Sequence, residues 1–184
     1  MIDRRRLKTL FDVVALVRSM RVGTLGPIEG SRALVRAWPG APDDAALAPF
    51  VAIDSESDDI VVGDRALWAA EYLRRVDRKY ERYEARLRGS IGAECDAVLA
   101  VLEPMLLECP ACGFGPLSQP AYDAAGAPSY RACPCCEFEP GVTDEVGYDA
   151  GTWRDRWVAA GMPFRRPPPP PAWNPEEQLR RPEF

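Results

Sequence analysis

Cys109-Pro110-Ala111-Cys112 and Cys133-Pro134-Cys135-Cys136 are the two stretches that decide how this chain folds. Each is a Cys-x-x-Cys motif, and residues 113–132 separate the two. A motif of this kind bends into a tight turn that directs two sulfurs toward one point, and the intervening segment is long enough to bring the second pair opposite the first. Zinc bound by four thiolates, each about 2.3 Å from the metal, satisfies this geometry. The sequence therefore predicts a zinc site formed by Cys109, Cys112, Cys133 and Cys136.

This predicted site is structural in type. Four cysteines close the coordination shell, whereas a catalytic zinc keeps one position open for water. Iron in a rubredoxin-type site uses the same pair of turns and stays an alternative, with aromatic side chains available to shield it: Phe114, Tyr130 and Phe138. Cys135 lies inside the second motif and is predicted to be a spectator, while Cys95 is predicted to be a core residue.

Composition excludes several classes of function. The chain of 184 residues has no His, which removes His-dependent nucleophilic pairs and every His-containing metal site. Its formal charge of −5 disfavours nucleic acid, which is bound by neutralising phosphates, and suits a basic partner better. No apolar run approaches the roughly 20 residues that span a bilayer, and no signal-peptide core follows the charged N-terminus. We therefore expect a cytoplasmic protein, in which reduced thiols favour metal over disulfide.

Apolar periodicity predicts an α+β protein in two parts. Residues 1–107 are expected to form a mainly helical domain with a two-stranded element. Its helices are expected at 4–20, 31–38 and 64–107, the last kinked or split at Gly89-Ser90, and its strands at 50–53 and 60–62. Residues 108–184 are expected to form a zinc-ribbon-like module. Its other predicted elements are a strand at 129–131, a Trp-bearing helix at 149–160, a polyproline strut at 167–171 and a terminal helix capped by Asn174.

Two charged stretches invite functional interpretations. The first ligands of an EF-hand calcium loop are matched by Asp54, Glu56 and Asp58. The Gly that such a loop requires is replaced by Asp59, and its closing Glu is replaced by Arg65, so we reject a calcium site. The helix at 64–107 interleaves basic and acidic residues. The basic ones are Arg74, Arg75, Arg78, Lys79, Arg82, Arg86 and Arg88, and the acidic ones are Glu71, Asp77, Glu81 and Glu84. RNA binding is one interpretation, but interleaved signs favour a solvated helix face.

Aromatic residues downstream of the cysteines complete a recognisable order. Four segments follow one another along the chain: Cys109–Phe114, Ser129–Gly141, Thr152–Trp157 and Trp173–Leu179. We expect the aromatic cover of the metal module to include Trp153, Trp157, Phe164 and Trp173. This order resembles the uncharacterised bacterial cysteine-rich CPCC proteins and their zinc-ribbon-like relatives, over about residues 107–180. The resemblance implies a four-Cys metal module without an assigned activity. Some of these relatives look like genes near bacterial toxin systems, which implies an immunity or interaction role.

Glu137 departs from the pattern of this family, in which Gly usually follows the last Cys. We expect it to adopt a positive φ at some conformational cost.

The favoured function is a non-enzymatic, zinc-stapled interaction protein, immunity-like, that binds a basic protein partner through an acidic surface. A nucleic-acid-associated zinc ribbon ranks second, because the acidic charge argues against it. A thiol-redox enzyme using Cys133, Cys135 or Cys136 as free thiols ranks third.

Overall fold

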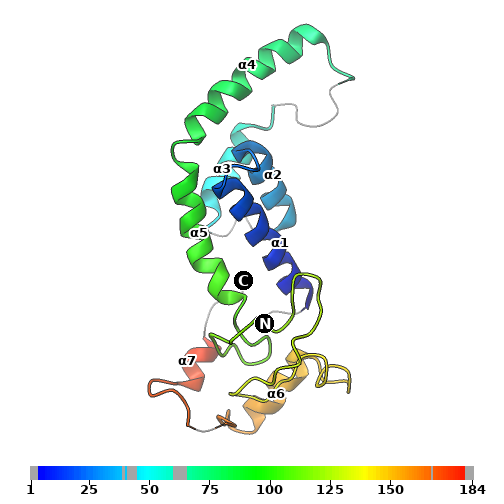
Figure 1. Cartoon of the computed structure of the whole chain (residues 1–184), viewed down its shortest axis with the longest axis vertical. Helices are drawn as coiled ribbons and strands as arrows, with labels where there is room; N and C mark the ends of the chain where they lie inside the picture. Colours follow the sequence, from blue (N-terminus) through cyan, green and yellow to red (C-terminus); the bar gives the residue numbers. More distant parts are fainter. Residues whose placement is uncertain (1–3, 39, 41–44, 60–65, 167, 181–184) are drawn as a thin grey trace. The chain divides into compact units, whose positions relative to one another are not determined.

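The computed structural model describes residues 4–38, 40, 45–59, 66–166 and 168–180, and within them the regular structure is helical (Figure 1). The helices are α1 (Arg4–Arg21), α2 (Pro27–Ala37), α3 (Ala48–Glu56), α4 (Ala70–Leu87), α5 (Ile91–Met105), α6 (Ala150–Ala159) and α7 (Pro175–Leu179). None of the helices in these ranges combines the length and the apolarity needed to cross a membrane.

The prediction of an α+β fold is wrong for the described residues, which contain no strand. The expected strand at 50–53 lies in α3, where Phe50 and Ile53 are both buried at the i, i+3 spacing of a helix face. Pro49 stands in the first turn of that helix, a position that favours helix initiation over strand pairing. Tertiary packing has therefore overridden the β-propensity of Val51 and Ile53.

The other two expected strands do not restore a sheet. Residues 60–62 lie outside the described residues. Ser129–Arg131 is not a strand, although Ser129 N donates to Ala121 O at 2.9 Å and an isolated antiparallel bridge joins Tyr122 to Pro128. The chain therefore forms a tight turn between Tyr122 and Pro128 and not a two-stranded sheet, because these two residues form an isolated bridge.

Several helix predictions are confirmed with shifted bounds. The helix expected at 4–20 is α1, and the helix expected at 31–38 is α2, which starts earlier because Pro27 occupies a first-turn position. The long helix expected at 64–107 is divided into α4 and α5 by a turn at 88–90. This break lies at the expected position, Gly89 and Ser90, which have low helix propensity. The Asp64 cap of the expected helix lies outside the described residues.

The chain divides into two compact units, and the division falls within α1 and α5. A helical unit comprises Asp12–Leu102, and a cysteine-bearing unit comprises Met1–Phe11 with Glu103–Phe184.

The helical unit is built around an apolar core to which α1, α2, α3, α4 and α5 all contribute. Fully or nearly buried members are Val13, Val14, Val17, Met20, Ile28, Leu34, Phe50, Ile53, Val76, Cys95 and Val98. The expected core position of Cys95 is confirmed, and burial raises the pKa of its thiol to about 11. This cysteine is therefore an inert apolar side chain at neutral pH.

α4 supplies the cap that α2 lacks. The N-cap residue of α2 is Gly26, which has no side chain to offer. The buried carboxylate of Glu84 on α4 takes over this role and accepts a hydrogen bond from Ile28 N at 3.3 Å. A Cβ at Gly26 would lie 3.0 Å from the same oxygen, so the glycine leaves room for the carboxylate. A negative charge at a helix N-terminus is stabilised by the helix dipole.

We expect Glu84→Ala to lower the free energy of unfolding by about 1–3 kcal/mol, because it leaves a buried N–H at the start of α2 without an acceptor. Glu81→Ala, on the exposed side of the same helix, is the matched control and should change stability little. Urea denaturation followed by circular dichroism measures both. Equal losses in the two variants would contradict the capping role.

Candidate metal centre

The two Cys-x-x-Cys motifs fold into the same turn. In the first, Cys109 N donates to Phe114 O at 2.9 Å and Gly113 N donates to Cys109 O at 2.8 Å. In the second, Cys133 N donates to Phe138 O at 2.9 Å and Glu137 N donates to Cys133 O at 2.8 Å. The six-residue turns Cys109–Phe114 and Cys133–Phe138 are therefore structural repeats, and each holds its two sulfurs on one side.

Each turn needs a left-handed residue directly after its second cysteine. Gly113 has φ of 74° and Glu137 has φ of 63°. The expectation of a positive φ at Glu137 is confirmed. A non-glycine residue in this conformation costs roughly 1–2 kcal/mol, so the second turn holds local strain that the first avoids.

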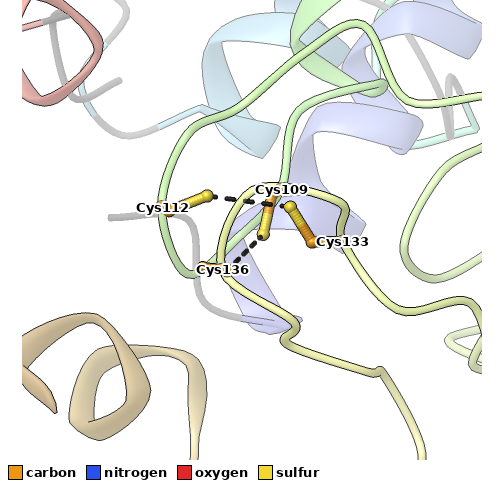
Figure 2. Close-up of side chains that lie close together, drawn as sticks. All are labelled: Cys109, Cys112, Cys133 and Cys136. Carbon is orange, nitrogen blue, oxygen red and sulfur yellow. Dashed lines mark hydrogen bonds between the residues drawn. The ribbon is translucent and has the colours of Figure 1, made fainter. Parts of the chain in front are cut away.

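The two turns bring the four predicted cysteines together (Figure 2). Cys109 Sγ lies 3.7 Å from Cys136 Sγ, and Cys112 Sγ lies 3.8 Å from Cys133 Sγ. All four sulfurs lie within 4.8 Å of one another, and none of the four residues is more than 2% exposed. A tetrahedron with metal–sulfur distances of about 2.3 Å has edges of about 3.8 Å. The cluster could therefore hold a metal ion with little rearrangement.

Protonation within the cluster is unequal. Burial raises the pKa of the Cys109 thiol, because a charged sulfur loses its hydration there. Hydrogen bonds from the neighbouring thiols, that of Cys109 first, lower the pKa of Cys133. A thiolate is thus favoured at Cys133 and disfavoured at Cys109. Ionisation of all four requires a cation among them.

Cys135 is buried but lies outside this group of four. Its Sγ is 3.8 Å from Nε2 of Gln178, an amide that belongs to α7. A hydrogen bond from the neighbouring thiol of Cys112 lowers the pKa of Cys135. The predicted ligand set is therefore brought together without Cys135.

Later segments of the chain satisfy the carbonyl groups of both turns. Gln178 Nε2 donates to Cys112 O at 2.7 Å, and Trp153 Nε1 donates to Cys136 O at 2.9 Å. The backbone N–H groups of Arg165 and Arg166 donate to Cys135 O and Pro134 O, both at 3.0 Å. Buried carbonyls need such partners, so residues 153–178 complete the site. Sequence reasoning missed these roles, because partners so distant in the chain leave no spacing signal.

Gln178 is also held from its other side. Its Oε1 accepts from Trp173 Nε1 at 2.9 Å, and the side chain is 7% exposed. The helix that carries it starts as predicted, with Asn174 Oδ1 accepting from Glu176 N and Glu177 N. The amide orientation is therefore fixed by three contacts.

The expected aromatic cover is confirmed. Trp157 belongs to the buried cluster around the cysteines, and Trp153, Phe164 and Trp173 pack against it. Phe164 forms edge-to-face contacts with Phe114 at 5.5 Å and with Trp173 at 5.1 Å between ring centroids. Tyr130, a residue proposed to shield an iron, is instead 59% exposed. Apolar cover of this kind keeps water from the sulfurs.

The acidic residues near 54–59 have intramolecular partners. Arg32 pairs with Asp54 at 3.7 Å, and Tyr83 Oη donates to Glu56 at 2.8 Å. Lys79 Nζ lies 2.6 Å from Asp59 and lowers the pKa of its carboxyl. These side chains form contacts within the helical unit, which agrees with the rejection of a calcium loop.

The chain matches no family model, no curated protein and no solved structure. The resemblance to the CPCC proteins therefore stays a prediction.

We expect Glu137→Gly to stabilise the cysteine-bearing unit by about 1 kcal/mol, because glycine adopts a positive φ without strain. Gly113→Ala should destabilise it by about the same amount: its Cβ would meet Gln178 O at an ordinary 3.6 Å, so the cost is conformational. Thermal unfolding of the two variants measures both effects.

The control is Glu145→Gly, at an exposed turn residue whose φ is not positive. This change should lower the unfolding temperature slightly, because glycine adds entropy to the unfolded chain. A gain there equal to that of Glu137→Gly would contradict local strain as the cause.

Gln178→Ala should cost about 1–3 kcal/mol, because it leaves the carbonyl of Cys112 buried without a donor. Gln119→Ala removes an exposed amide from the same unit and should be neutral within about 0.5 kcal/mol. Chemical denaturation followed by tryptophan fluorescence compares the two. A neutral Gln178→Ala would mean that this amide does not hold the first turn.

Proposed function

We propose that Cys109, Cys112, Cys133 and Cys136 bind one zinc ion as thiolates, and that the ion stabilises the fold of the cysteine-bearing unit. The observation that carries this proposal is the sulfur geometry, with 3.7 and 3.8 Å edges in a buried cluster. A segment with little regular structure, such as residues 106–149, gains most from a metal staple.

The donor set also supports a structural role for the ion. Four thiolates leave no coordination position for water or substrate, and the aromatic cover reduces access to the sulfurs further. Iron fits the same tetrahedron, so its exclusion rests on measurement and not on geometry. We accordingly propose a non-enzymatic protein that acts by binding another molecule, in a cytoplasmic setting where thiols stay reduced.

The acidic surface expected for a basic, toxin-like partner stays a prediction. Asp54, Glu56 and Asp59 would belong to such a surface, yet each engages a residue of its own unit. Groups that already have partners contribute less to a new interface, because their existing contacts must be exchanged for new ones.

Elemental mass spectrometry of the purified full-length chain should find one zinc per molecule. Cys133→Ser should lose the metal and the tertiary signal of the cysteine-bearing unit, since one of four ligands is missing. Strong chelators should produce the same loss in the unaltered chain.

Cys135→Ser is the matched control, because this cysteine stands in the same motif but outside the group of four. It should retain one zinc. Stoichiometric iron would redirect the proposal to electron transfer. A metal-free, stable fold with titratable thiols would overturn it and favour the thiol-redox alternative.

A further inference from the structure

Packing removes part of the acidic charge from the surface of α4, although the sequence interleaves acidic and basic residues. Glu84 is buried beneath the helix, where it caps α2, and Asp77 is half-buried. The acids left exposed are Glu71 and Glu81. The exposed basic residues are Arg74, Arg75, Arg78, Lys79, Arg82, Arg86 and, just after the helix, Arg88. Even with Lys79 paired to Asp59, exposed basic residues outnumber exposed acidic ones on the outer face of α4, in a chain whose net charge is −5.

Four of these arginines form a single row. Arg74, Arg78, Arg82 and Arg86 follow at i, i+4 intervals, which places them about 6 Å apart along the helix axis. Like charges at this spacing destabilise a helix. Within the described residues none of the four forms an ion pair, and Arg86 contacts the ring of Tyr83. The row thus opposes helix stability, and no ion pair in the described part of the chain ties up its guanidinium groups.

An aromatic pair, Trp68 and Tyr72, stands at the start of the same helix. Trp68 stacks on Tyr72 with ring centroids 5.2 Å apart and planes 18° apart. The side chain of Trp68 is 47% exposed, and Arg75 lies over the Tyr72 ring. An exposed indole beside a cationic row combines the two elements that proteins use for single-stranded nucleic acid: a stacking platform and a positively charged track.

We propose that the outer face of α4 binds single-stranded nucleic acid, with phosphates along the row Arg74, Arg78, Arg82 and Arg86 and a base stacked on Trp68. The aromatic pair favours this ligand over an acidic protein, which has no bases to stack. The net negative charge does not forbid it, because charges more than about 10 Å away are largely screened at 0.1 M salt. All these residues belong to the unit Asp12–Leu102, so the proposal does not depend on the zinc site.

The test is fluorescence anisotropy of a labelled oligothymidine of about 20 nucleotides, longer than typical site sizes of about 4–16 nucleotides. With four phosphates neutralised, the slope of log K against log salt should be about −3. Raising the salt from 50 to 200 mM should therefore weaken binding about 50-fold.

Three variants locate the surface. Arg78→Gln with Arg82→Gln should reduce the salt slope by about 1.4. Arg36→Gln with Arg131→Gln removes the same charge at exposed residues elsewhere and should leave both affinity and slope nearly unchanged. Trp68→Ala should weaken binding about tenfold with little change in slope, because it removes stacking and not charge. Circular dichroism confirms that each variant is folded.

Three results would overturn the proposal. The first is no binding at 50 mM salt by a folded protein. The second is an equal loss of affinity in the two double-arginine variants. The third is binding of a polyglutamate peptide as tight as that of the oligonucleotide, with no effect of Trp68→Ala on either. That result would assign the row to an acidic protein partner.

Discussion

The cysteine-bearing unit is organised by four sulfurs that cannot all be ionised at once without a cation between them. Their separations, 3.7 and 3.8 Å along two edges, match a tetrahedral thiolate shell. Between Leu106 and Tyr148 the backbone hydrogen bonds belong to turns, loops and one isolated bridge, and no helix or strand holds this segment. The two turns, their carbonyl partners and the aromatic cover are all arranged around that one requirement. A metal ion bound there, as proposed, would supply the cohesion that the helical unit draws from its apolar core.

Sequence reasoning succeeded where the signal was local. The spacing within each Cys-x-x-Cys motif identifies the cluster, and the residue after Cys136 identifies the strained position at Glu137. Asn174-Pro175 likewise marks the start of α7, because capping depends on neighbours in the chain.

Sequence reasoning failed where packing decides. The run at Phe50–Ile53 has the composition of a strand, yet its buried pair fits a helix face, and Pro49 together with tertiary contacts selects the helix. The exposure of the charged residues of α4 also depends on packing. The sequence contains Glu84 and Glu81 as equal acids three residues apart, whereas the fold buries one and exposes the other. A helix whose charges are interleaved in the sequence is therefore predominantly basic at its surface.

The contact between Gln178 and Cys112 bridges 66 residues of chain. During synthesis both Cys-x-x-Cys turns leave the ribosome well before the glutamine does. Until then the carbonyl of Cys112 lacks its Gln178 donor and the first turn lacks the α7 contact. Both pairs of cysteines are therefore synthesised before the residue that caps Cys112. A metal ion bound by them, as proposed above, would meet thiols that α7 does not yet cover.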